Sequence, residues 1–151
     1  MRSILLLPLL FLPLAAAPLR AQGCDDPRAT AEMARIRQEI GAPDVMCVEF
    51  ARGDVDGDGR DDAVLDIGYE VMGMENGSRS RLYVLFGDPA APLAAEPDEP
   101  RGAVQAVRID GPVIRVETLA SRPDDPPCCP SLIGTMVLRV EGRALLRALD
   151  L

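Results

Sequence analysis

The sequence contains no histidine and no lysine, so all sixteen of its basic residues are arginine. Histidine is the commonest general base near neutral pH and the commonest side-chain ligand of transition metals. Its absence, together with the lack of a G-x-S-x-G pattern around any serine, disfavours the common hydrolase mechanisms and transition-metal sites. No active site can be named from the sequence.

Positive charge is also scarce. The 24 acidic residues outnumber the arginines and give a net charge of −8. Binding to nucleic acid or to anionic membrane surfaces requires basic patches on the protein. We therefore expect neither kind of partner.

The longest hydrophobic run stands at the N-terminus. Arg2 precedes the apolar segment Ile4–Leu14, and small residues lead to Leu19-Arg20-Ala21. This layout predicts a secretory signal peptide over residues 1–21, followed by a single periplasmic or secreted domain over residues 22–151. Cleavage after Ala21 removes two arginines and no acid, which changes the net charge from −8 to −10.

The N-terminal segment has two alternatives to cleavage as a signal peptide, and both are disfavoured. A retained membrane anchor is disfavoured because Pro8 and Pro13 interrupt a run that is already short, so no stable membrane span is expected. A lipoprotein acylated at Cys24 is disfavoured because Ala21 stands where a lipoprotein motif has leucine.

The four cysteines, Cys24, Cys47, Cys128 and Cys129, predict two disulfides in an exported protein. Because a ring closed between adjacent cysteines is strained, bonds from Cys24 and Cys47 to Cys128 and Cys129 are slightly favoured over Cys24–Cys47 with Cys128–Cys129. A redox role for the adjacent pair has little support, since no C-x-x-C spacing is present.

One helix is predicted near the start of the domain. Asp25-Asp26-Pro27 is typical of a helix N-terminus, and Gly41 followed by Pro43 predicts its end. Apolar residues recur at helical spacing between these limits and predict one buried face: Ala29, Met33, Ile36 and Ile40.

The remainder of the domain is typical of strands and loops. The predicted strands are Val45–Phe50, Ala63–Tyr69, Arg81–Phe86, Val104–Ile109, Val113–Leu119, Leu132–Val140 and Ala144–Leu149. Arg81–Phe86 is apolar on both faces, as in a central strand, and residues 88–102 and 122–130 are predicted to be long loops. The pattern predicts an α+β domain in which one N-terminal helix packs on a mainly antiparallel, meander-like sheet of about six to seven short strands.

The most specific motif is the acidic loop Asp54–Asp62. Its residues at positions one, three, five and nine are Asp54, Asp56, Asp58 and Asp62, while Gly59 at position six permits a sharp turn and Arg60 at position seven offers its backbone carbonyl. Calcium takes six to eight oxygen ligands, and this spacing places four carboxylates and one carbonyl within one turn. The loop therefore predicts a calcium site, with a solvated Asp/Gly turn as the alternative.

An EF-hand is disfavoured because position twelve is Leu65 instead of glutamate and because a strand follows the loop. The run D-V-D-G-D-G-R-D-D, followed by A-V-L-D and later by R-L-Y-V-L-F-G-D, resembles an FG-GAP or VCBS repeat over about Val45–Asp88. This resemblance implies calcium bound by Asp54, Asp56, Asp58, Asp62 and the Arg60 carbonyl. It implies no propeller, because the chain has room for one or two blades.

The C-terminal part is similar to the end of small bacterial secreted proteins that pair such a loop with a Cys-Cys-Pro hairpin. The residues that carry this resemblance are P-V-I-R-V-E-T-L-A, R-P-D-D-P-P-C-C-P-S and M-V-L-R-V-E-G-R-A-L. It bears on the fold and implies no activity. Arg139, Arg143 and Arg147 in this part are expected to serve solubility, with pairing to acidic residues or presentation of an edge as the less favoured alternative.

Three functions are weighed. The leading one is a non-enzymatic, exported calcium-binding domain with a structural or binding role at the cell envelope, in which the ion and the disulfides supply stability that a small core lacks. The second is a calcium-ordered module that recognises an envelope protein or a glycan. The third is a hydrolase, for which neither a nucleophile nor a base can be named.

Overall fold

The computed structural model describes residues 23–42, 44–70, 78–97, 102–126 and 128–148. The predicted signal peptide, residues 1–21, lies outside them. No helix in the described part of the chain is long and apolar enough to cross a membrane.

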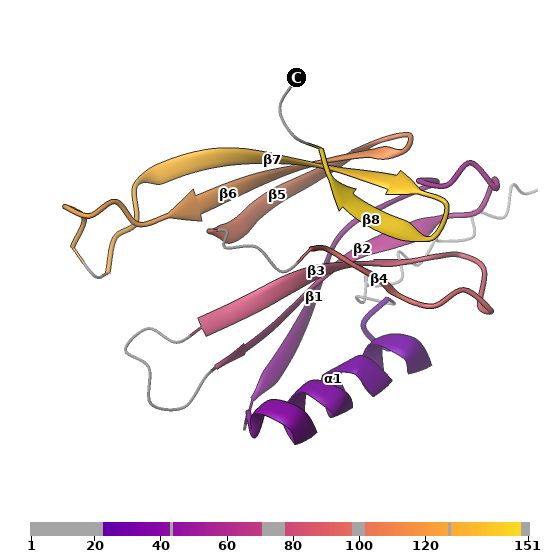
Figure 1. The fold of residues 1–151 in the computed structure, drawn as a ribbon, viewed down its shortest axis with the longest axis horizontal. Helices are drawn as coiled ribbons and strands as arrows, with labels where there is room; N and C mark the ends of the chain where they lie inside the picture. Colours follow the sequence, from indigo (N-terminus) through magenta and orange to yellow (C-terminus); the bar gives the residue numbers. More distant parts are fainter. Residues whose placement is uncertain (1–22, 43, 71–77, 98–101, 127, 149–151) are drawn as a thin grey trace, which may run out of the picture.

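The described residues form one helix and two four-stranded sheets. The helix is α1 (Pro27–Ile40), and the strands of the first sheet are β1 (Val45–Gly53), β2 (Asp62–Glu70), β3 (Ser78–Leu85) and β4 (Ala94–Ala95). The strands of the second sheet are β5 (Ala103–Asp110), β6 (Val113–Ala120), β7 (Leu132–Glu141) and β8 (Ala144–Arg147). Figure 1 shows three layers: the second sheet lies over the first, and α1 lies under the first.

The helix begins and ends where the sequence predicts. The Asp26 carboxylate caps its first turn by accepting a hydrogen bond from the Arg28 amide at 2.8 Å. Gly41 ends it with a φ of 68°, a left-handed conformation that suits glycine. Ile36 is buried, whereas Ile40 is 44% exposed, so the helix buries a narrower face than its apolar spacing predicts.

The prediction of a single sheet of six to seven strands is wrong. All strand pairings in the described residues are antiparallel between successive strands, as expected of a meander, but eight strands divide into two sheets. The additional strand, β4, is two residues long and lies inside a segment predicted to be loop. Periodicity shows which residues share a face, but it does not show whether a helix or a second sheet covers that face.

The first sheet has a hydrophobic cluster on each face. On β3, Tyr83 and Leu85 face the hydrophobic cluster under α1, whereas Leu82 and Val84 belong to the cluster between the sheets. The second sheet contributes to that inter-sheet cluster through residues that include Ile114 and Leu138. The apolar character of Arg81–Phe86 on both sides, which predicts a central strand, is explained by these two layers of cover.

The disulfides differ from the favoured prediction. Cys24 is bonded to Cys47, with their Cα atoms 5.8 Å apart, and Cys128 is bonded to Cys129. Cys24 precedes α1, and α1 packs on the face of the first sheet that includes Cys47, so the fold brings these two together. The Cys24–Cys47 bond indicates an oxidising, non-cytoplasmic compartment.

Candidate metal site

The acidic loop joins β1 to β2 at the end of the first sheet, where Gly53 pairs with Asp62. It therefore has a strand on each side, as predicted. Val55 is 1% exposed and belongs to the inter-sheet core, so it fixes the loop to the domain. Gly57 and Gly59 have φ values of 81° and 82°, and these left-handed turns fold the loop back on itself.

This folding brings Asp54, Asp56 and Asp58 together. Each offers one carboxylate oxygen, and the three oxygens lie within 4.8 Å of one another. Carboxylate oxygens are the ligands that calcium prefers. Three negative charges in so small a space repel one another, and a bound cation offsets that repulsion.

Backbone amides of the loop hold these carboxylates in place. Asp54 accepts hydrogen bonds from the amides of Gly57 at 2.7 Å and Gly59 at 2.9 Å. Asp56 accepts one from the Asp58 amide at 3.1 Å. The orientation of the acidic side chains is thus set by the same turn that the two glycines permit.

Asp62 has a different environment from the other acids. It is fully buried, and its two oxygens accept hydrogen bonds from the amides of Val55 at 2.8 Å and Gly87 at 2.7 Å. In this structure Asp62 ties the acidic loop to the residues after β3, and it is not in the group of three clustered carboxylates. Its role as a metal ligand stays a prediction, as does that of the carbonyl of the exposed Arg60.

Arg143, in the turn between β7 and β8, pairs with acidic residues, which is the less favoured of the roles expected for it. Its guanidinium donates a hydrogen bond to Asp88 at 2.9 Å, lies 3.7 Å from an Asp56 oxygen, and stacks 4.9 Å from the centre of the Phe86 ring. The side chain expected to serve solubility therefore connects the second sheet to the acidic loop. No local sequence pattern reveals this contact, because Asp88 is 55 residues away.

The segment that follows β3 links the acidic loop to the helix. Arg28 donates hydrogen bonds from α1 to the carbonyl oxygens of Phe86 at 3.0 Å, Asp88 at 2.9 Å and Ala91 at 2.8 Å. The Ala90 amide and then the Arg143 guanidinium hold the pKa of Asp88 below its usual value. The candidate site is thus bordered by residues that contact the helix and both sheets.

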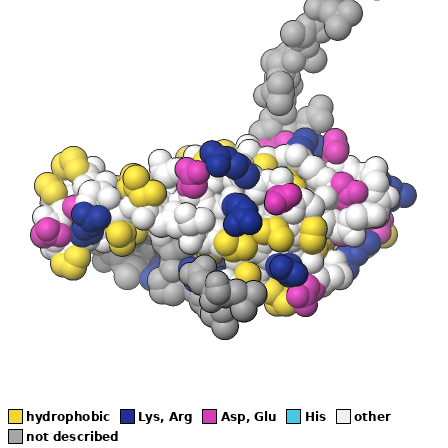
Figure 2. Space-filling model, turned by 90° about the horizontal axis from the view of Figure 1, so that it is seen from above, with side chains coloured by type: hydrophobic (Ala, Val, Ile, Leu, Met, Phe, Trp, Pro, Cys, Tyr) yellow, Lys and Arg dark blue, Asp and Glu magenta, His cyan; other side chains and the backbone are white. Residues whose placement is uncertain are grey.

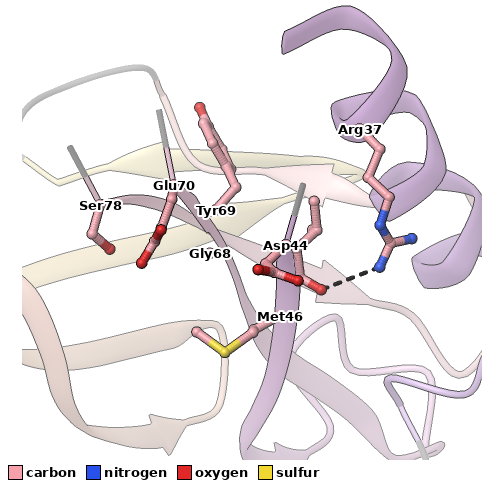
Figure 3. Close-up of a pocket in the computed structure, with 8 residues that line it drawn as sticks. Arg37, Asp44, Met46, Gly68, Tyr69, Glu70 and Ser78 are labelled. Atoms are coloured by element: carbon pink, nitrogen blue, oxygen red, sulfur yellow. Dashed lines mark hydrogen bonds between the residues drawn. The ribbon is translucent and has the colours of Figure 1, made fainter. Parts of the chain in front are cut away.

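A separate cavity of about 300 Å³ lies between the end of α1 and the neighbouring ends of β1 and β2. Figure 3 shows Arg37 reaching from the helix towards β1, where it donates a hydrogen bond to the Val45 carbonyl at 3.3 Å. Asp44, Glu70 and Ser78 also line this cavity. The chain has no histidine to activate Ser78, and the described lining residues include no recognisable catalytic pair.

The chain matches no family model, no curated protein and no solved structure. The likeness of Asp54–Asp62 to FG-GAP and VCBS loops therefore remains a resemblance of one motif.

Proposed function

We propose that this chain is an exported, non-enzymatic domain that binds calcium at the Asp54–Asp62 loop and uses the ion for a structural role at the cell envelope. The observation that carries the proposal is the approach of the Asp54, Asp56 and Asp58 oxygens to within 4.8 Å of one another. Asp62, the Arg60 carbonyl and water would complete the six to eight ligands that calcium takes.

The position of the loop supports a structural role. Val55 lies in the core between the sheets, and the Asp62 carboxylate accepts a hydrogen bond from the Gly87 amide after β3. An ion that orders this loop therefore stabilises contacts among segments far apart in sequence. A modest affinity, with a Kd of about 10⁻⁴ to 10⁻³ M, is typical of extracellular calcium modules and suits this role.

Calorimetric titration of the mature protein with calcium tests the proposal. We expect saturable binding, and we expect Asp58→Asn to weaken it at least about tenfold, because the substitution removes a negative charge from the site but keeps an oxygen that can accept the Arg60 amide. The matched control is Asp124→Asn, which makes the same charge change at an exposed position outside the site. The proposal is wrong if the wild type shows no binding up to several times 10⁻³ M calcium or if both variants bind alike.

Arg143 supplies a second test of the site. Its guanidinium pairs with Asp56 and would repel an incoming cation, so Arg143→Gln should raise calcium affinity about threefold or more at low ionic strength. Arg139→Gln, which makes the same charge change at an exposed position on β7, should leave the affinity near that of the wild type. Equal titration curves for the two variants would show that Arg143 does not compete with the ion.

A further inference from the structure

The two disulfides of this chain lie in different environments. Cys24 and Cys47 are partly buried and pack against the hydrophobic cluster under α1. Cys128 and Cys129 are both exposed, in the connection between β6 and β7. Figure 2 shows hydrophobic side chains gathered at the left end of the molecule, where this connection lies, and Leu132 and Ile133 at the start of β7 are 43% and 77% exposed. The adjacent pair is therefore open to an external thiol.

Adjacency also imposes a geometry that most disulfides avoid. The Cα atoms of Cys128 and Cys129 are 3.8 Å apart, as consecutive Cα atoms must be, whereas those of Cys24 and Cys47 are 5.8 Å apart. Relaxed disulfides join Cα atoms about 4.4 to 6.8 Å apart, and a bond forced outside this range is easier to reduce. Exposed or strained disulfides are the ones that exchange with thiols.

The connection between β6 and β7 does not need the Cys128–Cys129 bond to keep its shape. The Asp125 carboxylate accepts hydrogen bonds from the Arg122 amide at 2.8 Å, the Ser131 amide at 2.7 Å and the Ser131 hydroxyl at 2.7 Å. Through Asp125, these hydrogen bonds join the two ends of the connection, at Arg122 and Ser131. A bond between neighbouring residues closes so short a loop that it restricts the unfolded chain little. The geometry thus allows this bond to open while the fold persists.

From exposure, adjacency and the independent closure of the loop, we infer that Cys128–Cys129 is a thiol-exchange site that reacts with dithiols, whereas Cys24–Cys47 is a structural bond.

A thiolate of the dithiol attacks one protein sulfur and forms a mixed disulfide, and the other cysteine leaves as a thiolate. The second thiol of the reagent then displaces the remaining protein sulfur. The protein gains two electrons and two protons, and the dithiol becomes a disulfide. The absence of a C-x-x-C spacing does not prevent this chemistry, because exposure and strain replace the usual motif.

The test is an equilibrium titration of the oxidised, full-length mature protein with dithiothreitol. Thiols are trapped by alkylation and located by peptide mass spectrometry, and circular dichroism follows the fold. We expect Cys128 and Cys129 to be labelled at a dithiol concentration at least tenfold below that which labels Cys24 and Cys47, with an unchanged spectrum. Removal of the reductant and addition of oxidised glutathione should restore the bond without forming dimers.

The variant Cys128→Ser, Cys129→Ser provides the control, and it should release no thiols over the lower concentration range. The inference is overturned if that variant does release them, if both disulfides of the wild type open together, or if Cys128 and Cys129 are labelled before any reductant is added. It is also overturned if reduction of the adjacent pair unfolds the protein.

Discussion

Replacing Asp62 by alanine should lower the free energy of unfolding by about 3 kcal/mol, because the buried amide of Val55 and the partly buried amide of Gly87 both lose their acceptor. Each unsatisfied buried amide costs about 1 to 3 kcal/mol. Asp62 is fully buried, so water cannot easily replace the missing carboxylate. The measurement is urea unfolding at neutral pH with a calcium chelator present, which separates this structural role from any contribution of a bound ion.

The neighbouring residue supplies the control for that experiment. Asp61 is exposed, so Asp61→Ala removes the same charge and should change the stability by no more than about 0.5 kcal/mol. A loss below about 1 kcal/mol for Asp62→Ala would mean that its two hydrogen bonds are replaced by solvent. A loss that appears only when calcium is present would instead identify Asp62 mainly as a metal ligand.

Replacing both Cys24 and Cys47 by serine should also cost about 3 kcal/mol, the magnitude expected for opening a disulfide that spans 23 positions of sequence. The bond ties the segment before α1 to β1, and both cysteines pack against the cluster that holds the helix. We expect a lower urea midpoint than that of the wild type, and we expect the helix to unfold at a lower urea concentration. The measurement is equilibrium unfolding of the oxidised proteins, monitored by circular dichroism.

Comparison with the double variant Cys128→Ser, Cys129→Ser also tests which cysteines are bonded to each other. With the pairing seen in the structure, this second variant should lose less than about 1 kcal/mol, because its bond constrains almost no chain. With cross-pairing between the two ends of the chain, both double variants would open loops of about 100 residues and would lose similar, large amounts. Equal destabilisation of the two variants would therefore contradict the observed pairing.

Local features of the fold were predictable because local chemistry decides them. The cap at Asp26 and the left-handed Gly41 fix the ends of α1 through contacts within a few residues. The turns at Gly57 and Gly59 and the amide contacts of Asp54 likewise arise within the acidic loop. In each case the residue that selects the conformation is a neighbour of the residue that adopts it.

Contacts between distant segments were not predictable in the same way. Pairing with an acid was the less favoured expectation for Arg143, yet it binds Asp88 because the β7–β8 turn of the second sheet lies against the end of the first. The favoured cysteine pairing rested on strain in a ring of adjacent cysteines. It was wrong because α1 packs on the first sheet and so brings Cys24, which precedes the helix, next to Cys47 on β1. Neither outcome follows from the spacing of residues along the chain.

The sequence by itself determined the helix and its limits, most strand positions, the antiparallel meander and a turn that gathers carboxylates. The tertiary structure alone decided that the strands divide into two stacked sheets, that Asp62 accepts hydrogen bonds from the amides of Val55 and Gly87, and that Arg143 reaches the acidic loop. The physical reason is that periodicity and turn chemistry specify which side chains share a face. What covers that face depends on the packing of whole layers, and this packing is fixed by burial of apolar surface between segments far apart in the chain.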